Sequence, residues 1–392
     1  MKTIIIFFNI QLPEGSAAAT RACAWGELLK KAGYSPIMLG VNYYKSNIIN
    51  GVYKEIPYYL IDTPELQNKG LKSIKRDGIL KRKIEDFIVE ISAKKEIQAI
   101  ILGNPEVEVK WLLKVGKKIN VPIIPDIVEW YDISRFNGKF ALIRLLQNRT
   151  TLRYWNVKAH NVICISSLLE KYYSKRGCNT LRIPTILDTK DFRTNVDENN
   201  KSDKIILAYA GSPAKKDLII NVAKALYVLD SKDRAKVKLR VYGINLEELK
   251  NLGLDLEIIE EISDSLECFG KIPHNELINQ VSQADYTVLL RPNKRYANAG
   301  FPTKVGESMA MRVPVIANIT SDIGKYLHDN IEGIICEDES PVACASAIKK
   351  AISLSTDNNK EMRMNAGKQA ERSFDYRNYV DQVRIFIEEI KK

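Results

Sequence analysis

The first half of the chain alternates apolar runs with stretches in which apolar residues recur at helical spacing. Thr3–Asn9 is an almost continuous apolar run, typical of a strand buried on both faces of a sheet. Ala17–Lys31 has helical periodicity and is followed by Gly33, a residue suited to a helix C-terminus. Further strands are predicted at Ser35–Val41, Ala99–Gly103, Val121–Val128 and Asn161–Ser166. Strands that alternate with helices indicate βαβ units and a parallel sheet.

A second alternation begins after the polar stretch Arg193–Asp203, which has no apolar periodicity and is typical of a linker. Its predicted strands are Ile205–Ala210, Val237–Tyr242, Leu266–Phe269, Tyr286–Leu290, Val313–Ala317 and Gly333–Cys336, with helices at Asp217–Leu229 and Asn275–Ala284. We therefore predict an α/β fold of two facing, doubly wound Rossmann-like domains, residues 1–190 and 191–372, with a cleft between them. A C-terminal helix over residues 373–392 is expected to pack back on the first domain. Ligands of such sheets bind at the carboxyl ends of the strands.

Composition narrows the function. The 392 residues exceed one typical core, and the net charge of +11 favours anionic partners. Basic residues are not interleaved with stacking aromatics in a known module, so nucleic acid is not an expected partner. Six cysteines without a C-x-x-C pair, three histidines and no D-x-D pair predict that no metal is bound. The apolar start is too short for a signal peptide, and no run reaches the roughly 20 residues of a membrane span, which predicts a cytoplasmic protein.

The most informative stretch follows the predicted strand Tyr286–Leu290. Gly300 allows close approach of the backbone to a ligand, and Pro302 suits the first position of a helix. The N–H groups that open this helix, with Lys304 beside them, suit an anion. Glu307 lies one turn on, where its carboxylate can accept two hydrogen bonds from the vicinal hydroxyls of a ribose. The alternative is an ordinary capped helix with a surface salt bridge between Lys304 and Glu307.

Loops after two other predicted strands carry similar chemistry. One has Gly211 with Lys215 and Lys216, and the other has Gly270 and Lys271. Arg291 stands at the end of the strand Tyr286–Leu290 itself. Lysines at a helix start suit a pyrophosphate, and backbone beside a glycine can read a base edge. A solvated lysine pair and a structural arginine salt bridge are the alternatives. The convergence of these strand ends favours a nucleotide site.

These residues carry a family resemblance. The matching pieces are Tyr209–Ser212, Phe269–Ile272, Ala284-Asp285, Gly300–Lys304, Glu307–Ala310 and Val313–Ala317. They resemble the retaining GT-B glycosyltransferases of family four, also called group 1, and the Gly-Phe-Pro-Thr-Lys stretch is most similar to the capsule and exopolysaccharide branch. The specific motifs cover roughly residues 205–340. Two positions depart from the family pattern: Ala299 stands where a first acidic residue is common, and Ser212 where an arginine is common.

The resemblance implies a UDP- or GDP-linked sugar donor and no cofactor. It assigns the ribose to Glu307 and the diphosphate to Lys216, with Lys215 in reserve. The donor-binding set it implies, together with the strand-end loops, is Gly15, Ser16, Gly211, Ser212, Lys215, Lys216, Gly270, Lys271, Ile272, Arg291, Gly300, Phe301, Pro302, Thr303, Lys304 and Glu307. The predicted catalytic residues are Glu129, Asp132, Lys216 and Arg291. Arg291 would supply the charge that Ser212 lacks.

Three stretches of the first half add candidates. Gly15-Ser16 follows the first strand, where small residues admit a ligand or simply allow close packing. Asp126–Asp132 combines acids with aromatic residues, so Glu129 or Asp132 could orient an acceptor hydroxyl while the rings form a sugar platform or pack into the core. Arg135–Lys158 mixes basic and apolar residues, as in a helix that contacts an anionic membrane or packs on its own domain.

The predicted function is that of a retaining glycosyltransferase. It would transfer a sugar from a nucleoside diphosphate to a glycan or lipid-linked acceptor during surface polysaccharide synthesis, with possible placement at the inner face of the membrane. A nucleotide-sugar epimerase on the same fold is one alternative. A non-catalytic partner subunit of a glycosyltransferase complex is another, motivated by Ala299.

Overall fold

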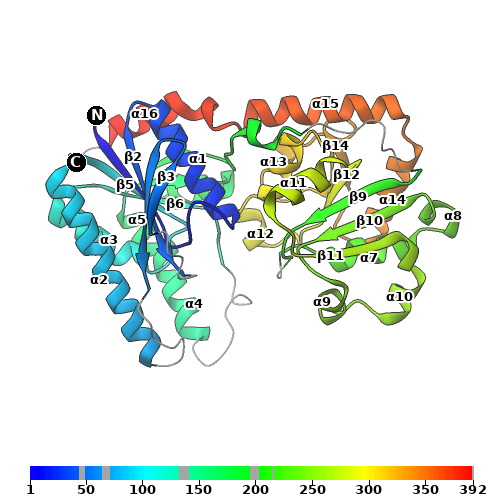
Figure 1. The fold of residues 1–392 in the computed structure, drawn as a ribbon, viewed down its shortest axis with the longest axis horizontal. Helices are drawn as coiled ribbons and strands as arrows, with labels where there is room; N and C mark the ends of the chain where they lie inside the picture. The colour runs from blue at the N-terminus through cyan, green and yellow to red at the C-terminus, as the bar shows by residue number, and fades with distance from the viewer. Residues whose placement is uncertain (44–48, 64–70, 132–140, 195–202, 214–215, 391–392) are drawn as a thin grey trace. The chain divides into compact units, whose positions relative to one another are not determined.

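A computed structural model describes residues 1–43, 49–63, 71–131, 141–194, 203–213 and 216–390, with the side chains of 71–75 left aside. The chain divides into two compact units (Figure 1). Unit 1 comprises Met1–Leu187 with Tyr376–Lys392, and unit 2 comprises Asp188–Asp375. Each unit contains one mainly parallel sheet flanked by helices, which confirms the predicted α/β class. No helix in the described ranges is both long and apolar enough to cross a membrane.

Unit 1 contains an eight-stranded sheet in the order β3-β4-β2-β1-β5-β6-β7-β8. Its strands are β1 Thr3–Phe8, β2 Ser35–Asn42, β3 Asn50–Tyr53, β4 Ile56–Asp62, β5 Ile97–Gly103, β6 Ile123–Ile127, β7 Asn161–Cys164 and β8 Asn179–Arg182. All neighbours are parallel except β3, which runs antiparallel to β4. The central strand β1 is buried along its whole length, as its apolar run predicts. The sequence pattern missed β3, β4 and β8, because strands that are only partly buried lack a continuous apolar run.

Helices cover both faces of this sheet with two separate apolar cores. They are α1 Ala17–Lys31, α2 Leu71–Lys94, α3 Glu108–Ile119, α4 Ala141–Thr150, α5 Asn156–Lys158, α6 Ser167–Ser174 and α16 Val380–Glu389, with a π-helical turn at Thr151–Trp155. One core joins Trp25 and Leu28 of α1 to Phe386 of α16. The other joins Ile88 of α2 to Leu112 of α3. The final helix therefore belongs to the core of unit 1.

Unit 2 contains a six-stranded, wholly parallel sheet in the order β11-β10-β9-β12-β13-β14. Its strands are β9 Ile205–Ala210, β10 Val237–Tyr242, β11 Leu266–Gly270, β12 Tyr286–Leu289, β13 Val315–Asn318 and β14 Gly333–Cys336. The chain builds outward from β9 through β10 and β11, then crosses back to β12 on the other side of β9. The strand order thus reverses between β9 and β12, and ligands of such sheets bind at this switch point.

Nine α-helices connect and flank these strands in the described part of unit 2. They are α7 Ile219–Val228, α8 Ser231–Arg234, α9 Leu246–Asn251, α10 Leu256–Glu261, α11 His274–Ser282, α12 Arg295–Ala299, α13 Thr303–Ala310, α14 Pro341–Ser353 and α15 Thr356–Ser373. The sequence pattern did not predict α12. The helix predicted to begin at Asp217 begins instead at Ile219, so Asp217 lies in the loop after β9.

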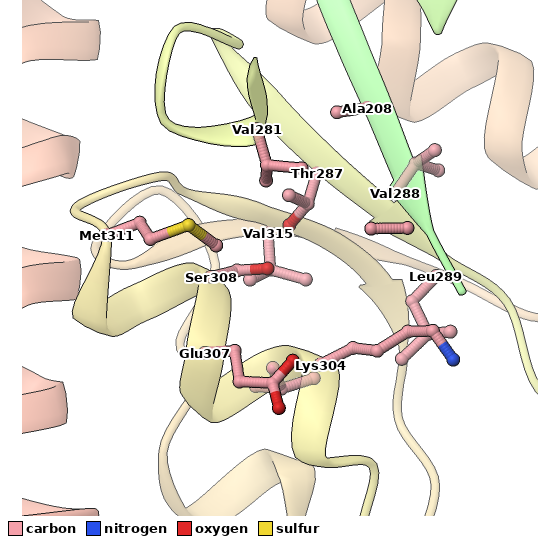
Figure 2. Close-up of a pocket in the computed structure, with 12 residues that line it drawn as sticks. Ala208, Val281, Thr287, Val288, Leu289, Lys304, Glu307, Ser308, Met311 and Val315 are labelled. Carbon is pink, nitrogen blue, oxygen red and sulfur yellow. The ribbon is translucent and has the colours of Figure 1, made fainter. Parts of the chain in front are cut away.

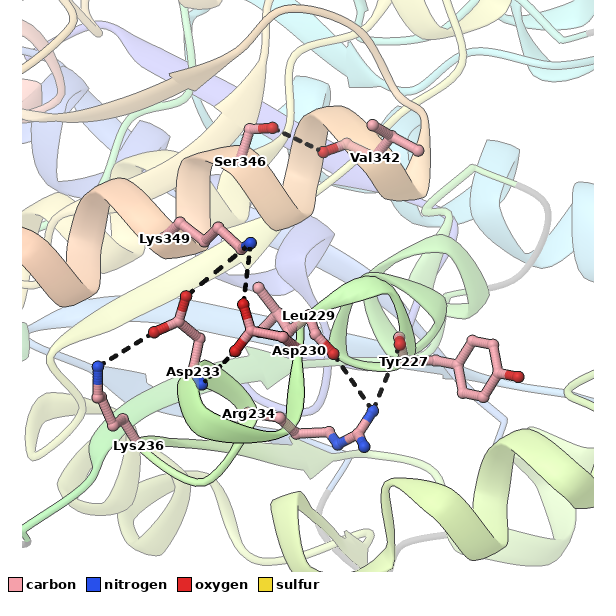
Figure 3. Close-up of polar contacts among 9 residues, drawn as sticks. All are labelled: Tyr227, Leu229, Asp230, Asp233, Arg234, Lys236, Val342, Ser346 and Lys349. Carbon is pink, nitrogen blue, oxygen red and sulfur yellow. Dashed lines mark hydrogen bonds and ion pairs between the residues drawn. The ribbon is translucent and has the colours of Figure 1, made fainter.

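A charged network holds α8 and α14 together at the end of unit 2 where β10 begins (Figure 3). Asp230 caps α8 through the Asp233 backbone N–H, at 2.9 Å. Lys349 of α14 lies 3.3 Å from Asp230 and 3.9 Å from Asp233. Such exposed pairs contribute little to stability, because solvent screens the charges. The network is remote from the carboxyl ends of the strands and supplies control positions for the site described below.

Candidate active site

Glycines lie at the carboxyl ends of three neighbouring strands in unit 2 and are hydrogen-bonded across the sheet. Gly211 follows β9 and has a φ of 127°, Gly243 follows β10 with a φ of 99°, and Gly270 is the last residue of β11 with a φ of 67°. The Gly211 N–H donates to the Tyr242 carbonyl at 2.9 Å, and the Gly243 N–H donates to the Gly270 carbonyl at 2.6 Å. A Cβ on Gly243 would lie 2.8 Å from the Gly211 backbone. Only glycine fits at residue 243, and the positive φ values favour glycine at residues 211 and 270. Sequence reasoning selected Gly211 and Gly270 but missed Gly243, which also comes directly after an apolar strand.

Helix α13 begins at Thr303, and Pro302 occupies its N-cap position. No side chain caps the helix. The Val305 N–H donates to the Pro302 carbonyl at 3.1 Å, but in the described part of the chain the N–H groups of Thr303 and Lys304 have no such acceptor and are available to an anion. Phe301 is buried and packs against Tyr326 and Phe374, with ring centroids 5.5 and 5.7 Å away. The Phe301 ring therefore anchors this loop to the core, and its backbone is the part that a ligand can contact.

The carboxylate of Glu307 lies one turn into α13, beside the switch point. It lines a small cavity of about 30 Å³ together with Ala208 of β9, Thr287 of β12 and Ser308 (Figure 2). This volume admits water but not a nucleotide, so a donor would bind outside the cavity. Burial raises the pKa of Glu307, and the positive charges of Lys304 and His274 oppose that rise. Within the described ranges, no hydrogen bond or ion pair involves the Glu307 carboxylate.

Lys304 does not form the salt bridge with Glu307 that was the alternative to a ligand site. Its Nζ donates instead to Oδ2 of Asp217, at 2.7 Å. The same oxygen accepts a hydrogen bond from the Tyr209 hydroxyl at 2.9 Å, and Oδ1 lies 3.5 Å from Nε of Arg291. We call these four residues the Asp217 cluster. Sequence reasoning did not select Asp217, although an acid directly after two lysines at a strand end was a signal of an internal partner.

Arg291 lies in the interior of unit 2, with 5% of its surface exposed. Asn318 fixes its backbone: the Arg291 N–H donates to Oδ1 at 2.9 Å, and Nδ2 donates to the Arg291 carbonyl at 2.8 Å. Nε and Nη1 of the guanidinium have no hydrogen-bond partner among the residues described. Two cations therefore share the single carboxylate of Asp217. A buried excess of positive charge is costly, and an anionic ligand would neutralise it.

Other residues that were predicted to bind the donor lie in the loops that follow β9 and β11. Ser212 and Lys271 are exposed, and Lys216 is partly buried. Lys215 lies outside the described residues. His274, the first residue of α11, is close enough to Glu307 to act on its pKa and was not predicted. A histidine at a helix start directly after Gly270–Pro273 could have been recognised as a polar group at this edge of the sheet.

Ala299 ends α12 and is fully buried. Its neighbour Asn298 accepts a hydrogen bond from the Ser321 N–H at 2.7 Å and donates to Asn293 at 2.7 Å. These two hydrogen bonds hold the end of α12, and the Ala299 side chain beside Asn298 is not exposed to solvent.

In unit 1, Gly15 has φ 102°, and Ser16 caps α1 by accepting a hydrogen bond from the Ala19 N–H at 3.1 Å. Both are exposed at the carboxyl end of β1. Glu129 is partly buried two residues after β6, and Asp132 lies outside the described residues. The rings of this loop are not free sugar platforms. Trp130 and Tyr131 are buried, Trp130 against Tyr172 at 4.8 Å and Tyr131 through a 2.7 Å hydrogen bond from Asn104.

Comparison with known families agrees with the geometry of unit 2. Residues 191–373 match the family described as glycosyl transferases group 1. They form a group 1 glycosyltransferase domain, and the protein is a glycosyltransferase. The comparison with curated proteins gives no match.

Solved structures show the same fold over the whole chain. Sucrose-phosphate synthase from Thermosynechococcus elongatus has a TM-score of 0.71 at 15% identity, covering 99% of each chain. A glycosyltransferase from Rickettsia africae ESF-5 has a TM-score of 0.70 at 16% identity, covering 100% of this chain and 99% of that one. Alr3699/HepE from Anabaena has a TM-score of 0.68 at 15% identity, covering 100% of each. These similarities establish the GT-B fold.

Proposed function

We propose that this enzyme transfers a sugar, with retention of configuration, from a UDP- or GDP-linked donor to a glycan or lipid-linked acceptor in surface polysaccharide synthesis. One observation carries the donor assignment. The unpaired carboxylate of Glu307 lies on α13 beside an uncapped helix N-terminus and a cluster with an excess of buried positive charge. Carboxylate and cations match the ribose hydroxyls and the diphosphate of a nucleotide sugar. The structurally similar Alr3699/HepE, which has been crystallised with UDP and glucose, supports the same choice.

In this proposal the cations act on the leaving group. Negative charge grows on the diphosphate as the glycosidic bond breaks, and Lys216, Lys304, Arg291 and the N-terminus of α13 would stabilise it. Because Ala299 stands where an acid is common in the family, sugar recognition would rely on the Gly300–Thr303 backbone. Glu129 of unit 1, with Asp132, would orient the acceptor hydroxyl for attack on the same face that the nucleotide leaves.

A panel of nucleotide sugars tests the donor assignment. We expect one UDP- or GDP-sugar, at a hundred times its dissociation constant, to add about 2.7 kcal/mol to the free energy of unfolding measured by thermal shift. Product analysis with that donor then separates the alternatives. Turnover without an acceptor would indicate an epimerase, and binding without sugar release under any acceptor would indicate a non-catalytic subunit. Failure of every nucleotide sugar to stabilise the protein would overturn the proposal.

The described part of the Arg135–Lys158 stretch supports a proposed contact with an anionic membrane. Helix α4 buries Leu145 in unit 1 but leaves Leu142, Ile143 and Leu146 exposed by 64%, 52% and 53%. Exposed arginines, including Arg144, lie on the same helix, and the sequence has no acidic residue from position 133 to 169. Apolar side chains ringed by basic ones suit the interface of an anionic bilayer, where a lipid-linked acceptor would be located.

Sedimentation with vesicles tests this contact. We expect binding to phosphatidylglycerol vesicles that falls about tenfold in Leu142→Ser/Leu146→Ser, because two exposed leucines no longer enter the bilayer. Val342→Ser is the matched control, since Val342 is 63% exposed on α14 of unit 2. Equal binding to neutral and anionic vesicles, or no difference between the two variants, would exclude this surface.

A further inference from the structure

We propose that Asp217 is a positioning residue that holds Lys304 away from Glu307, so that the carboxylate of Glu307 stays free for the donor's ribose. This inference rests on the proposed function and assigns a role to a side chain that the function itself does not require. It explains why an acid lies buried among the cations of a site for an anion: the Asp217 side chain is only 8% exposed. An acid there weakens the attraction for a diphosphate, so it needs another reason to be present.

The Lys304 side chain is long enough to contact either of two carboxylates, those of Glu307 and Asp217. Glu307 is three residues further along α13, and residues at this spacing are neighbours on a helix surface. A Lys304–Glu307 pair would occupy the carboxylate that the ribose needs. In the structure Lys304 extends away from Glu307 (Figure 2), and its Nζ lies 2.7 Å from Asp217. The competition between the two acids therefore decides whether the nucleoside site is open.

The contacts around Asp217 favour it in that competition. The Tyr209 hydroxyl donates to the same carboxylate oxygen, and the Lys304 ammonium lies 5.4 Å from the centroid of the Tyr209 ring. Charge-assisted hydrogen bonds in such a buried setting are stronger than those of exposed pairs. Nε of Arg291 lies 3.5 Å from the other carboxylate oxygen, so Asp217 has a second cation beside it that helps to hold its side chain in place.

Gly211 provides the path along which Lys304 reaches Asp217. A Cβ on Gly211 would lie 2.8 Å from Cε of Lys304 and 3.0 Å from its Nζ. A side chain at residue 211 would therefore displace the end of the lysine. With glycine at this position the ammonium group reaches Asp217, and the lysine side chain points away from Glu307 (Figure 2).

The first experiment needs no nucleotide. The pKa of Glu307 can be measured by carboxyl-carbon NMR, with Glu307→Gln to assign its signal. Lys304 and His274 are the charged groups that act on this carboxyl, and only Lys304 is affected by the variants. We expect that Asp217→Asn releases Lys304, which then moves toward Glu307 and lowers the pKa of Glu307. In the double variant Asp217→Asn/Lys304→Met the pKa of Glu307 should rise again. An unchanged Glu307 pKa in Asp217→Asn would overturn the inference.

The second experiment uses uridine and guanosine, which have a ribose but no phosphate. Calorimetry with the nucleoside that the wild type binds should show about tenfold weaker affinity in Asp217→Asn, with recovery in the Asp217→Asn/Lys304→Met variant. Asp217→Glu should retain most of the affinity, because it keeps the charge. Asp230→Asn makes the same chemical change in the remote network of Figure 3 and should have no effect.

The outcomes separate this inference from the proposed function. If Asp217→Asn weakens binding of the nucleoside diphosphate but not of the nucleoside, Asp217 only orients the cations and the inference is wrong. If Asp217→Asn does not fold, Lys304→Met alone decides: it should lose diphosphate affinity yet retain nucleoside affinity, and loss of both contradicts the inference. If the wild type binds neither nucleoside nor nucleotide, the proposed function fails, while the NMR titration still tests the position of Lys304.

Discussion

Replacing Glu307 with alanine is expected to weaken binding of the nucleotide donor by about a hundredfold or more, because two hydrogen bonds to a charged acceptor are lost at once. The carboxylate is the acid of α13 that lines the cavity at the switch point, and none of the described residues forms a hydrogen bond or ion pair with it. Calorimetry with the nucleoside diphosphate measures the loss. Glu276→Ala on the exposed face of α11 is the control and should bind normally. Wild-type affinity in Glu307→Ala would remove Glu307 from the site.

The raised pKa of Glu307 adds a pH dependence to this prediction. Only the ionised form of Glu307 accepts hydrogen bonds from both ribose hydroxyls, so affinity should fall as the pH is lowered and the carboxylate is protonated. Because the pKa of Glu307 is raised, this loss should begin at a higher pH than it would for an ordinary glutamate. Stability should change in the opposite sense. Between the unfolded and folded pKa values the folded state binds more protons, so the free energy of unfolding falls as the pH rises through that interval. Glu307→Gln should therefore raise the melting temperature at neutral pH while binding is lost. A lower melting temperature would contradict the assigned cause of the shift.

Replacing Asp126 with asparagine is expected to destabilise the protein by about 3–5 kcal/mol, because it leaves a buried arginine without its partner. Asp126 lies within β6 and is fully buried. Its two carboxylate oxygens accept hydrogen bonds from Nε and Nη2 of Arg21, at 2.7 Å each. Trp25 donates to the same carboxylate at 2.9 Å. The remaining donors of Arg21 reach the carbonyls of Pro184 and Ile183, at 2.7 and 3.2 Å. This one ion pair thus joins α1, β6 and the chain after β8.

Urea unfolding followed by a spectroscopic probe measures the effect on stability. The double variant Arg21→Met/Asp126→Asn removes both charges and should be less destabilised than the sum of the single variants, since neither charge remains uncompensated. Glu90→Gln, in the exposed pair with Lys94 on α2, is the control and should change stability by less than about 1 kcal/mol. If Asp126→Asn and Glu90→Gln change the free energy of unfolding equally, the buried pair stabilises the protein no more than an exposed pair does.

Much of the fold was predictable because a strand that is buried on both faces of its sheet has a continuous apolar run in the sequence. The boundaries of β9, β10 and β14 and of α1 agree with the apolar pattern. Strands β3, β4 and β8 were missed because half-exposed residues alternate too irregularly to be recognised. The short helix α12 was missed for a related reason, since five residues are too few to show a helical period.

The candidate site was predictable in its parts. Glu307, Lys304, Gly211, Gly270 and Arg291 were selected because glycines and charged residues directly after parallel strands must meet at one edge of the sheet. The partners of those charges were not predictable. The sequence offered only Glu307, a helix neighbour, as a partner for Lys304, but Lys304 contacts Asp217, 87 residues away along the chain. The role of Trp130 and Tyr131 was also left open by the sequence, and the structure buries them in unit 1.

By itself, the sequence determined the α/β class, the alternation of strands and helices, and the strand ends at which charged residues gather, because hydrophobic periodicity and glycine positions are local properties. Only the tertiary structure decided which carboxylate each cation contacts, that Gly243 must be glycine, and that Ala299 faces the interior. Those features depend on distances between residues far apart in the chain, and a pairing of charges follows from proximity and burial rather than from spacing along the sequence.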